Sequence, residues 1–468
     1  MNKNSSLETT TLATIARASR VAALGWAAYV VACGAPAPRP ADRTTVASES
    51  AHAAGTATDG GSGVLGASPE PARRTSCELP KIIVPEAYAG PISPPQPKLE
   101  HPERLEYFFR QVIKSAQGEL SRPVRIGFYG DSNLTLDFLS GELRRILQKQ
   151  HGDGGHGYVA VGKPWRWYQH IDVHHDFVGA WRFYCPTTLR DSRRIYGSAG
   201  ISAATRSPGA KGKYSTASAD APVGKTLTRF GAYYLTASKG GDFALVADGE
   251  QRALVSTQAA SQGTSYAEIK LPDTAHKLEV VAKSKREIRL FGVVMERDQG
   301  VVVDSLGIGG VGYYALAELE PNTTEQMLRH RDYDLVMFLL GTNLFRAGDN
   351  GRALGEIVAL HRKANPNVAI LVMSPPDQVA NKGAKHSKPS IVKVSAQLRA
   401  AADANSVAYW DFREAMGGDA SMATFYRHGL AGGDLYHFTK TGAAFMGSRI
   451  AHALWGGLSD YAATQRCE

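Results

Sequence analysis

The sequence has few cysteines, few long apolar stretches and no block of basic residues. Four cysteines occur in 468 residues, and none of them stands in a catalytic motif. Beyond the N-terminus, no run approaches the roughly 18 to 20 apolar residues of a membrane span, which excludes a multi-span membrane protein. The net charge is +9. Because the lysines and arginines are scattered, this charge does not by itself select a partner, and we do not expect nucleic acid.

Several common functional motifs are also missing. The glycines of 152–157 are not followed by Gly-Lys-Ser/Thr, so they form no P-loop and are expected to make backbone turns. The elbow Gly-x-Ser-x-Gly is absent, because Leu134 occupies its last position. His174 and His175 lack a third ligand at a metal-binding spacing, so no metal site is predicted.

The N-terminal segment has the pattern of an export signal. A polar, basic start is followed by an apolar stretch over 21–32 and then by Cys33. This pattern predicts a lipoprotein signal over 1–33 with lipidation at Cys33; a simple signal peptide or a single anchor helix are the alternatives. Residues 34–75 are rich in Ala, Pro, Ser, Thr and Gly and predict a disordered tether. We therefore expect an exported protein of the periplasm or cell envelope that contacts the membrane only through a lipid anchor.

The remaining cysteines permit one disulfide in an oxidising compartment. These are Cys77, Cys185 and Cys467. The ends of a folded region often lie close together, which favours a pair between Cys77 and Cys467.

The folded part begins and ends with an α/β pattern. Residues 76–164 and 301–468 contain apolar strands that alternate with helical periodicities, which predicts a parallel sheet with helices on both faces. The expected strands are 124–129, 334–340, 368–373 and 407–410, and the expected helices are 102–117, 136–147, 352–364, 390–404 and 440–455.

The segment that lies between these two α/β parts has a different sequence pattern. Over 165–300, short alternating apolar runs recur every 8 to 12 residues or so, separated by turn signals such as Asp248-Gly249. This spacing predicts an all-β sandwich inserted into the α/β domain.

Three polar loops of the α/β parts carry residues with catalytic chemistry. Ser132 follows a buried strand in Gly-Asp-Ser132, and Asp434 stands three residues before His437. A serine needs a base to take its proton, and that histidine needs a carboxylate to fix its tautomer. Asn343, in Gly-Thr-Asn343, follows another buried strand and can donate a hydrogen bond to an oxyanion. This order of residues predicts a serine hydrolase; each motif alone also fits a helix cap or a loop.

Together these motifs resemble the SGNH (GDSL-like) hydrolases, with Gly-Ile-Gly-Gly310 as a further block. The resemblance implies a three-layer α/β/α sheet and a catalytic triad of Ser132, Asp434 and His437. It also implies an oxyanion hole from Ser132, Gly310 and Asn343, and no metal or organic cofactor. A narrower resemblance, through stretches such as 140–144, is to peptidoglycan O-acetylesterases, whose inserted β domain is jelly-roll and carbohydrate-binding-like. Asn133 departs from that pattern, since such relatives often have His there.

The resemblance implies an acetylesterase that acts on an O-acetylated polysaccharide, peptidoglycan first, through an acetyl-enzyme. An O-acyltransferase, another carbohydrate or lipid esterase, and a non-catalytic wall-binding lipoprotein remain the alternatives. Trp165, Trp167 and Tyr168 cluster where the core meets the insert. Their rings could stack on sugars or simply pack in the core.

Overall fold

The computed structural model describes residues 81–343 and 350–464. The predicted signal segment with Cys33, the tether over 34–75 and the Cys77–Cys467 disulfide lie outside these ranges. Cys185 lies inside them and is a buried free thiol. None of the helices in the described ranges combines the length and the apolar character needed to cross a membrane.

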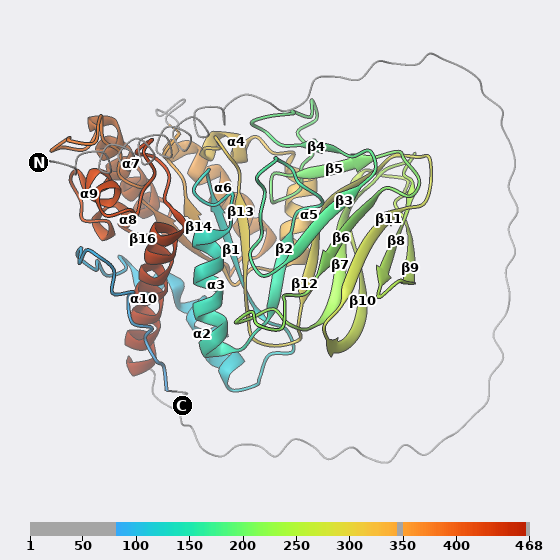
Figure 1. Cartoon of the computed structure of the whole chain (residues 1–468), viewed down its shortest axis with the longest axis horizontal. Helices are drawn as coiled ribbons and strands as arrows, with labels where there is room; N and C mark the ends of the chain where they lie inside the picture. The colour runs from blue at the N-terminus through green and yellow to red at the C-terminus, as the bar shows by residue number, and fades with distance from the viewer. Residues whose placement is uncertain (1–80, 344–349, 465–468) are drawn as a thin grey trace, which may run out of the picture. The chain divides into compact units, whose positions relative to one another are not determined.

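A parallel sheet forms the α/β part, as the sequence predicts, but it has five strands, and β13 is not among the four that the sequence analysis expects (Figure 1). The strand order is β13-β1-β14-β15-β16, which is 2-1-3-4-5 when the strands of this sheet are numbered along the chain. Chain direction across the sheet therefore reverses beside the first strand, β1. The strands are β1 (Val124–Gly130), β13 (Val301–Gly307), β14 (Leu335–Leu339), β15 (Ala369–Met373) and β16 (Ala408–Trp410).

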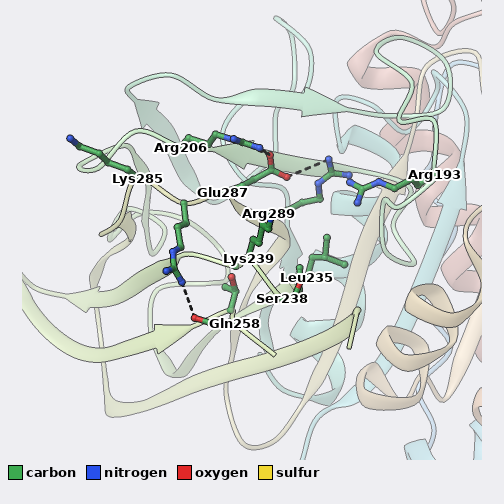
Figure 2. Close-up of a pocket in the computed structure, with 13 residues that line it drawn as sticks. Arg193, Arg206, Leu235, Ser238, Lys239, Gln258, Lys285, Glu287 and Arg289 are labelled. Carbon is green, nitrogen blue, oxygen red and sulfur yellow. Dashed lines mark hydrogen bonds and ion pairs between the residues drawn. The ribbon is translucent and has the colours of Figure 1, made fainter. Parts of the chain in front are cut away.

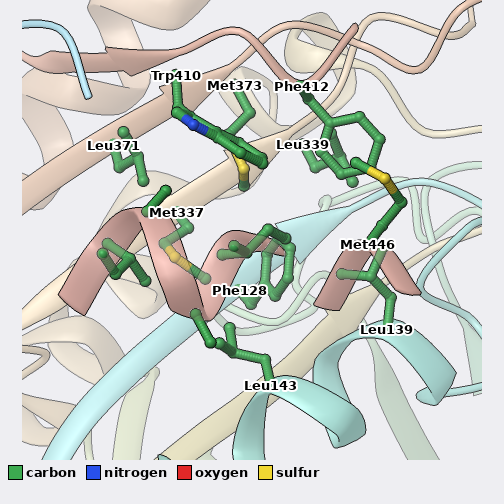
Figure 3. Packing of buried hydrophobic residues seen from close by; sticks show 14 of the residues in the cluster. Phe128, Leu139, Leu143, Met337, Leu339, Leu371, Met373, Trp410, Phe412 and Met446 are labelled. Atoms are coloured by element: carbon green, nitrogen blue, oxygen red, sulfur yellow. The ribbon is translucent and has the colours of Figure 1, made fainter. Parts of the chain in front are cut away.

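Alternation of side chains along each strand gives the sheet two apolar faces. Phe128, Met337 and Leu339 point to one face, where they form a cluster with the helices α2, α3 and α10 (Figure 3). Val336 and Phe338 point to the opposite face and pack with α5, α6 and α7. The helices of these two layers are α2 (Glu106–Ala116), α3 (Phe138–His151), α10 (Lys440–Thr464), α5 (Pro321–Arg331), α6 (Asn350–Ala364) and α7 (Pro389–Ala404). The short helices are η1 (Pro102–Leu105), α4 (Tyr313–Ala317), α8 (Phe412–Ala415) and α9 (Ser421–Arg427).

Between β1 and β13 the chain forms two antiparallel sheets that share an apolar core. One sheet has the order β10-β7-β12-β5-β4, with β2 also paired to β12, and the other has the order β3-β6-β11-β8-β9. Phe230 and Tyr234 of β7 face the second sheet, whereas Tyr233 and Leu235 of the same strand join the α/β core. The strands are β2 (Gly155–Val159), β3 (His174–Val178), β4 (Arg182–Tyr184), β5 (Ser202–Thr205), β6 (Lys211–Ser215), β7 (Leu227–Thr236), β8 (Asp242–Ala247), β9 (Glu250–Ser256), β10 (Gly263–Thr274), β11 (Lys277–Ala282) and β12 (Ile288–Glu296).

These sheets begin at Gly155, whereas the sequence places the start of the insertion at 165. The glycines around 155 are not only turn residues, because Gly155 and Gly157 lie in a strand that pairs with β12. Both have positive φ angles, 93° and 72°. A Cβ on Gly155 would lie 2.6 Å from the carbonyl oxygen of Met295. The close approach of two backbones, rather than a turn alone, requires glycine here.

A buried ion network joins the parallel sheet to the antiparallel one. Arg331, at the end of α5, donates to Asp304 of β13 at 2.7 and 2.8 Å and to Glu296 of β12 at 2.6 Å. Arg125 of β1 donates to Glu296 at 2.9 Å. The side chains of Arg331, Asp304 and Glu296 are at most 2% exposed. Burial alone would raise the pKa of Glu296, but the charges and hydrogen bonds of Arg125 and Arg331 lower it to about 2.

We expect Arg331→Ala to lower the free energy of unfolding by about 3 to 5 kcal/mol, because it leaves two buried carboxylates without their shared cation. Arg329→Ala is the matched control, since Arg329 is 60% exposed on the same helix and should cost at most about 1 kcal/mol. Urea denaturation of both variants at pH 7 measures the difference. Equal losses of stability would contradict the importance of the network.

Candidate active site

The turn after β1 presents Ser132 at the carboxyl edge of the sheet. The N–H of Leu134 donates to the Asp131 carbonyl at 3.1 Å, which closes the turn. The Leu134 side chain then folds back over two glycines. A Cβ on Gly130 would lie 2.6 Å from Leu134 Cδ1, and one on Gly307 would lie 2.5 Å from Leu134 Cβ. The leucine that replaces the last glycine of a Gly-x-Ser-x-Gly elbow therefore anchors this turn.

Ser132, His437 and Asp434 form a continuous hydrogen-bonded chain. His437 Nε2 lies 2.7 Å from Ser132 Oγ, and His437 Nδ1 lies 2.7 Å from Asp434 Oδ2. With Nδ1–H donating to the carboxylate, Nε2 is free to accept the serine proton. The structure thus brings the three predicted residues together with the spacing of a catalytic triad.

The loop between α9 and α10 holds the base and its carboxylate. Asp434 Oδ1 accepts the backbone N–H groups of Tyr436 at 2.9 Å and His437 at 3.1 Å. Leu435 between them adopts a positive φ of 63°, which is uncommon for a leucine. Its side chain is buried in the core beneath α10, so packing stabilises this conformation. The three-residue spacing of Asp434 and His437 is therefore a closed backbone turn rather than a helix face.

Charges around His437 favour its protonated form. Burial lowers the pKa of His437, but the hydrogen bond and charge of Asp434, together with the charge of Asp131, raise it above its ordinary value. Burial raises the pKa of Asp434, and its hydrogen bonds with His437 outweigh this effect and lower it. The Asp434 carboxylate therefore stabilises the imidazolium that forms when His437 takes a proton.

Asp131, directly before the nucleophile, has a fully buried carboxyl group. Its Oδ1 accepts the Asn133 N–H at 3.1 Å, which supports the serine turn. Burial raises the pKa of this carboxyl group above its usual range. The sequence suggested Asp131 only as part of a motif, whereas the structure gives it a place beneath the triad.

The predicted oxyanion donors come from three neighbouring strands. Ser132 follows β1, Gly310 follows β13 and Asn343 follows β14, and β1 lies between the other two strands. Asn343 Nδ2 donates one hydrogen bond to the Val311 carbonyl at 2.9 Å, so its amide is fixed beside the 308–311 turn and keeps a second N–H. Gly310 has a φ of 76°, which suits glycine. Among the described residues, the N–H groups of Ser132 and Gly310 have no hydrogen-bond acceptor.

The proposed sugar-stacking residues are mostly internal. Trp165 is 6% exposed and Tyr168 is 9% exposed, and both belong to the core between the parallel sheet and the antiparallel sheet that contains β7 and β12. Their ring centroids lie 5.4 Å apart in an edge-to-face contact, and the Tyr168 hydroxyl accepts the Ala160 N–H. Stacking of Trp165 and Tyr168 on a sugar is therefore wrong, because packing already covers these rings. Trp167 is partly buried against the same core.

Asn133 is a positioning residue that the sequence did not reveal. It is 8% exposed, and its amide joins the serine turn to the histidine loop. Nδ2 donates to the Tyr436 carbonyl at 3.3 Å, and Oδ1 accepts the Phe438 N–H at 3.2 Å. These bonds bracket His437 on both sides. No sequence signal marks the role, because the partners lie about 300 positions away.

Comparisons with known proteins agree with this geometry. The model of the GDSL-like lipase/acylhydrolase family matches residues 284–445, which include Gly310, Asn343, Asp434 and His437. Ser132 lies before this range, because the antiparallel sheets separate it from the rest of the site. No curated protein matches the chain.

A solved structure described as a peptidoglycan O-acetylesterase in action is 22% identical, covers 76% of this chain and 96% of its own, and gives a TM-score of 0.64. Family two carbohydrate esterases give much lower scores. The one from Clostridium thermocellum is 11% identical, with coverage of 58% and 97% and a TM-score of 0.27. The one from Cellvibrio japonicus is 13% identical, with coverage of 62% and 99% and a TM-score of 0.25. The first likeness supports a shared fold, and the other two carry no argument.

The parallel sheet, the Ser132–His437–Asp434 triad and the family match over 284–445 define a carboxylic ester hydrolase that resembles the SGNH (GDSL-like) hydrolases. Within that class, its fold resembles that of the solved peptidoglycan O-acetylesterase.

The raised pKa of His437 predicts an acid limb in the pH profile. The base accepts a proton only when it is neutral, so kcat/KM should fall as the pH drops below a midpoint above 6.5. Asp434→Asn should move this midpoint to lower pH and reduce kcat by about 10⁴-fold. The pH dependence of aryl acetate hydrolysis measures both effects. A midpoint below 6.5 in the unmodified enzyme would contradict the assignment.

Asn133→Ala should reduce kcat by up to about a hundredfold with little change in KM, because His437 would lose its alignment with Ser132. Asn133→Asp keeps the acceptor for the Phe438 N–H and should restore part of the activity. The exposed Asn367→Ala variant is the control. Steady-state kinetics with an aryl acetate separate kcat from KM; an Asn133→Ala enzyme as active as the control would disprove the role.

Proposed function

We propose that the protein is a serine esterase that removes O-acetyl groups from a cell-envelope polysaccharide, namely peptidoglycan. The observation that carries the proposal is the unbroken chain from Ser132 through His437 to Asp434, with both contacts at 2.7 Å. The fold likeness to a peptidoglycan O-acetylesterase supports the choice of substrate.

The reaction begins when Ser132 Oγ attacks the carbonyl carbon of the acetyl ester. His437 Nε2 takes the serine proton, and Asp434 stabilises the imidazolium. The tetrahedral intermediate places its negative oxygen against the Ser132 and Gly310 N–H groups and the Asn343 amide. The ester C–O bond then breaks, and His437 gives its proton to the departing sugar oxygen.

The acetyl group is now bound to Ser132 as an ester. His437 removes a proton from a water molecule, which attacks the acetyl carbonyl carbon. The same donors hold the second oxyanion, acetate leaves, and the proton returns to Ser132 Oγ. No other group is required to balance the reaction.

The two antiparallel sheets are proposed to be an inserted jelly-roll domain of carbohydrate-binding character. The loop 185–201 between β4 and β5 supports this role, because it reaches the oxyanion hole. A Cβ on Gly310 would lie 3.9 Å from Thr187 Cγ2. On the other flank of this turn, Gly200 lies against Ile308. The insertion would therefore shape the side of the cleft where the sugar enters.

The enzyme is proposed to act outside the cytoplasm as a lipoprotein attached through Cys33, with residues 34–75 as its tether. Attachment at the membrane would place the triad within reach of the wall polymer. The N-terminal sequence pattern is what supports this part of the proposal.

The test is acetate release from O-acetylated peptidoglycan by a chain carrying Cys33→Ser, which blocks lipidation. Ser132→Ala should reduce the rate at least about a thousandfold. The exposed Ser390→Ala variant is the control and should be fully active. Acetate is measured by an enzyme-coupled assay.

Each of the other outcomes identifies an alternative. Hydrolysis of a small aryl acetate without release from peptidoglycan would keep the triad and reject the glycan. Transfer of the acetyl group to an added sugar, rather than to water, would indicate an acyltransferase. Binding of wall fragments without any turnover would indicate a wall-binding protein.

A further inference from the structure

A basic cavity lies in the antiparallel sheets, apart from the triad. Its volume is about 550 Å³, and segments that are distant in sequence form its wall. These are the loop 185–201, the end of β5, the turn after β7, the residues after β9 and the start of β12 (Figure 2). None of the triad or oxyanion residues lines it.

Positive charge dominates this wall. Of 13 lining residues, six are lysine or arginine and one, Glu287, is acidic. Glu287 is already paired with Arg206 at 3.1 Å and lies 3.9 Å from Arg289. The other cations that line the cavity are Arg193, Lys239, Lys285 and Arg286.

Three of these cations, Lys239, Lys285 and Arg286, have no carboxylate partner among residues 81–343 and 350–464. Arg286 instead donates to the side-chain oxygen of Gln258 at 2.9 Å. A concave surface with unmatched charge of one sign concentrates counter-ions of the opposite sign.

Arg289 is the buried cation of this wall. It is 4% exposed, and its Nη1 is paired with Asp191. Its guanidinium carbon lies 4.6 Å from the centre of the Tyr184 ring. Nε, however, is buried without a hydrogen-bond partner. A buried, unpaired N–H of a cation is costly, so this guanidinium is not fully satisfied by its protein partners.

Uncharged polar groups complete the wall. Ser238, Thr257 and Gln258 line the cavity beside the cations, and Leu235 supplies an apolar contact. A cavity of this size is larger than a single small anion needs and is within the range for a drug-sized ligand. The mixture of hydroxyl, amide and guanidinium groups suits a sugar that carries a carboxylate.

The cavity is connected to the active site through a single loop. Thr187 of the loop 185–201 lies against the Gly310 turn, and Arg193 of the same loop lines the cavity. The loop is internally fixed, because Asp191 accepts the Arg193 N–H at 2.7 Å and pairs with Arg289. The same loop therefore borders both places.

We propose that this cavity is an anion-binding subsite that holds carboxylate groups of an acidic glycan chain while another part of the chain is deacetylated. The proposal rests on the proposed function for the identity of the polymer, since peptidoglycan carries carboxylates on its sugars and peptides. Two-point attachment would raise the affinity for polymer without any change in the chemistry at Ser132.

The experiment uses the full chain with Cys33→Ser and Ser132→Ala, so that binding is measured without turnover. Titration calorimetry compares soluble uncross-linked peptidoglycan chains, oligogalacturonate as a carboxylated probe and chitohexaose as a neutral probe. Lys285→Glu with Arg286→Glu should weaken binding of both acidic probes at least about tenfold. Both side chains are exposed, so the fold should be preserved, and Lys239→Glu is a second variant.

The matched control is Lys213→Glu with Lys270→Glu. Both lysines are exposed on β6 and β10, do not line the cavity, and give the same change in net charge. The control should bind the acidic probes nearly as well as the parent chain. Equal losses in both double variants, or equal affinity of the parent for chitohexaose and oligogalacturonate, would overturn the subsite.

A separate readout distinguishes this proposal from the proposed function. With Ser132 restored, the Lys285→Glu/Arg286→Glu enzyme should keep its kcat/KM for an aryl acetate and show a KM for O-acetylated peptidoglycan at least about tenfold higher. If peptidoglycan is not deacetylated at all but oligogalacturonate binding still depends on Lys285 and Arg286, the function fails and the subsite stands. If peptidoglycan turnover is unaffected by the substitution, the subsite fails and the function stands.

Discussion

The structure depends on one buried guanidinium that two carboxylates share. Arg331 is held between Asp304 of the parallel sheet and Glu296 of the antiparallel sheet. Asp304 also accepts the Tyr158 N–H of β2 at 2.8 Å, so the first strand of the insertion is attached to the same carboxylate. Such a buried network contributes little net stability compared with apolar packing. An arrangement that leaves one of its charges buried without a partner, however, is strongly destabilised. The network therefore fixes how the two sheets meet.

That junction has a functional consequence. Because the insertion is held against the α/β core, its loop 185–201 lies beside Gly310 rather than in solvent. The same loop carries Arg193 to the basic cavity. The turn that carries Gly310 and one wall of the basic cavity are thus joined by a single loop.

The sheet order explains where the reaction takes place. In a doubly wound sheet, ligands bind where the strand order reverses, and here that point lies beside β1. Ser132 and the two other predicted oxyanion donors, Gly310 and Asn343, follow the three strands at this point. Asn133 then links the nucleophile to His437, which comes from the opposite end of the chain. Position along the sheet edge, rather than closeness in sequence, assembles the site.

Much of this could be predicted from local pattern. Buried apolar runs such as 334–340 identify parallel strands, and helical periodicity identifies their covering helices. Ser132 and the Asp434–His437 pair were recognisable because a nucleophile, a base and a carboxylate leave a compact signature. The strand over 155–159 was missed because its glycines are also typical of turns. Their other role, which is to let the backbone of β2 approach that of β12 closely, becomes visible only when the two strands are seen paired.

The sequence by itself determined the alternation of elements, the residue types of the triad and the insertion between them, because these depend on short-range periodicity and intrinsic chemistry. The tertiary structure alone decided the rest. It buried Trp165 and Tyr168, which sequence could equally place on a sugar. It gave Asn133 its partners and gathered cations from separate strands around one cavity. Such features depend on contacts between residues far apart in the chain, and no local pattern encodes which of those contacts form.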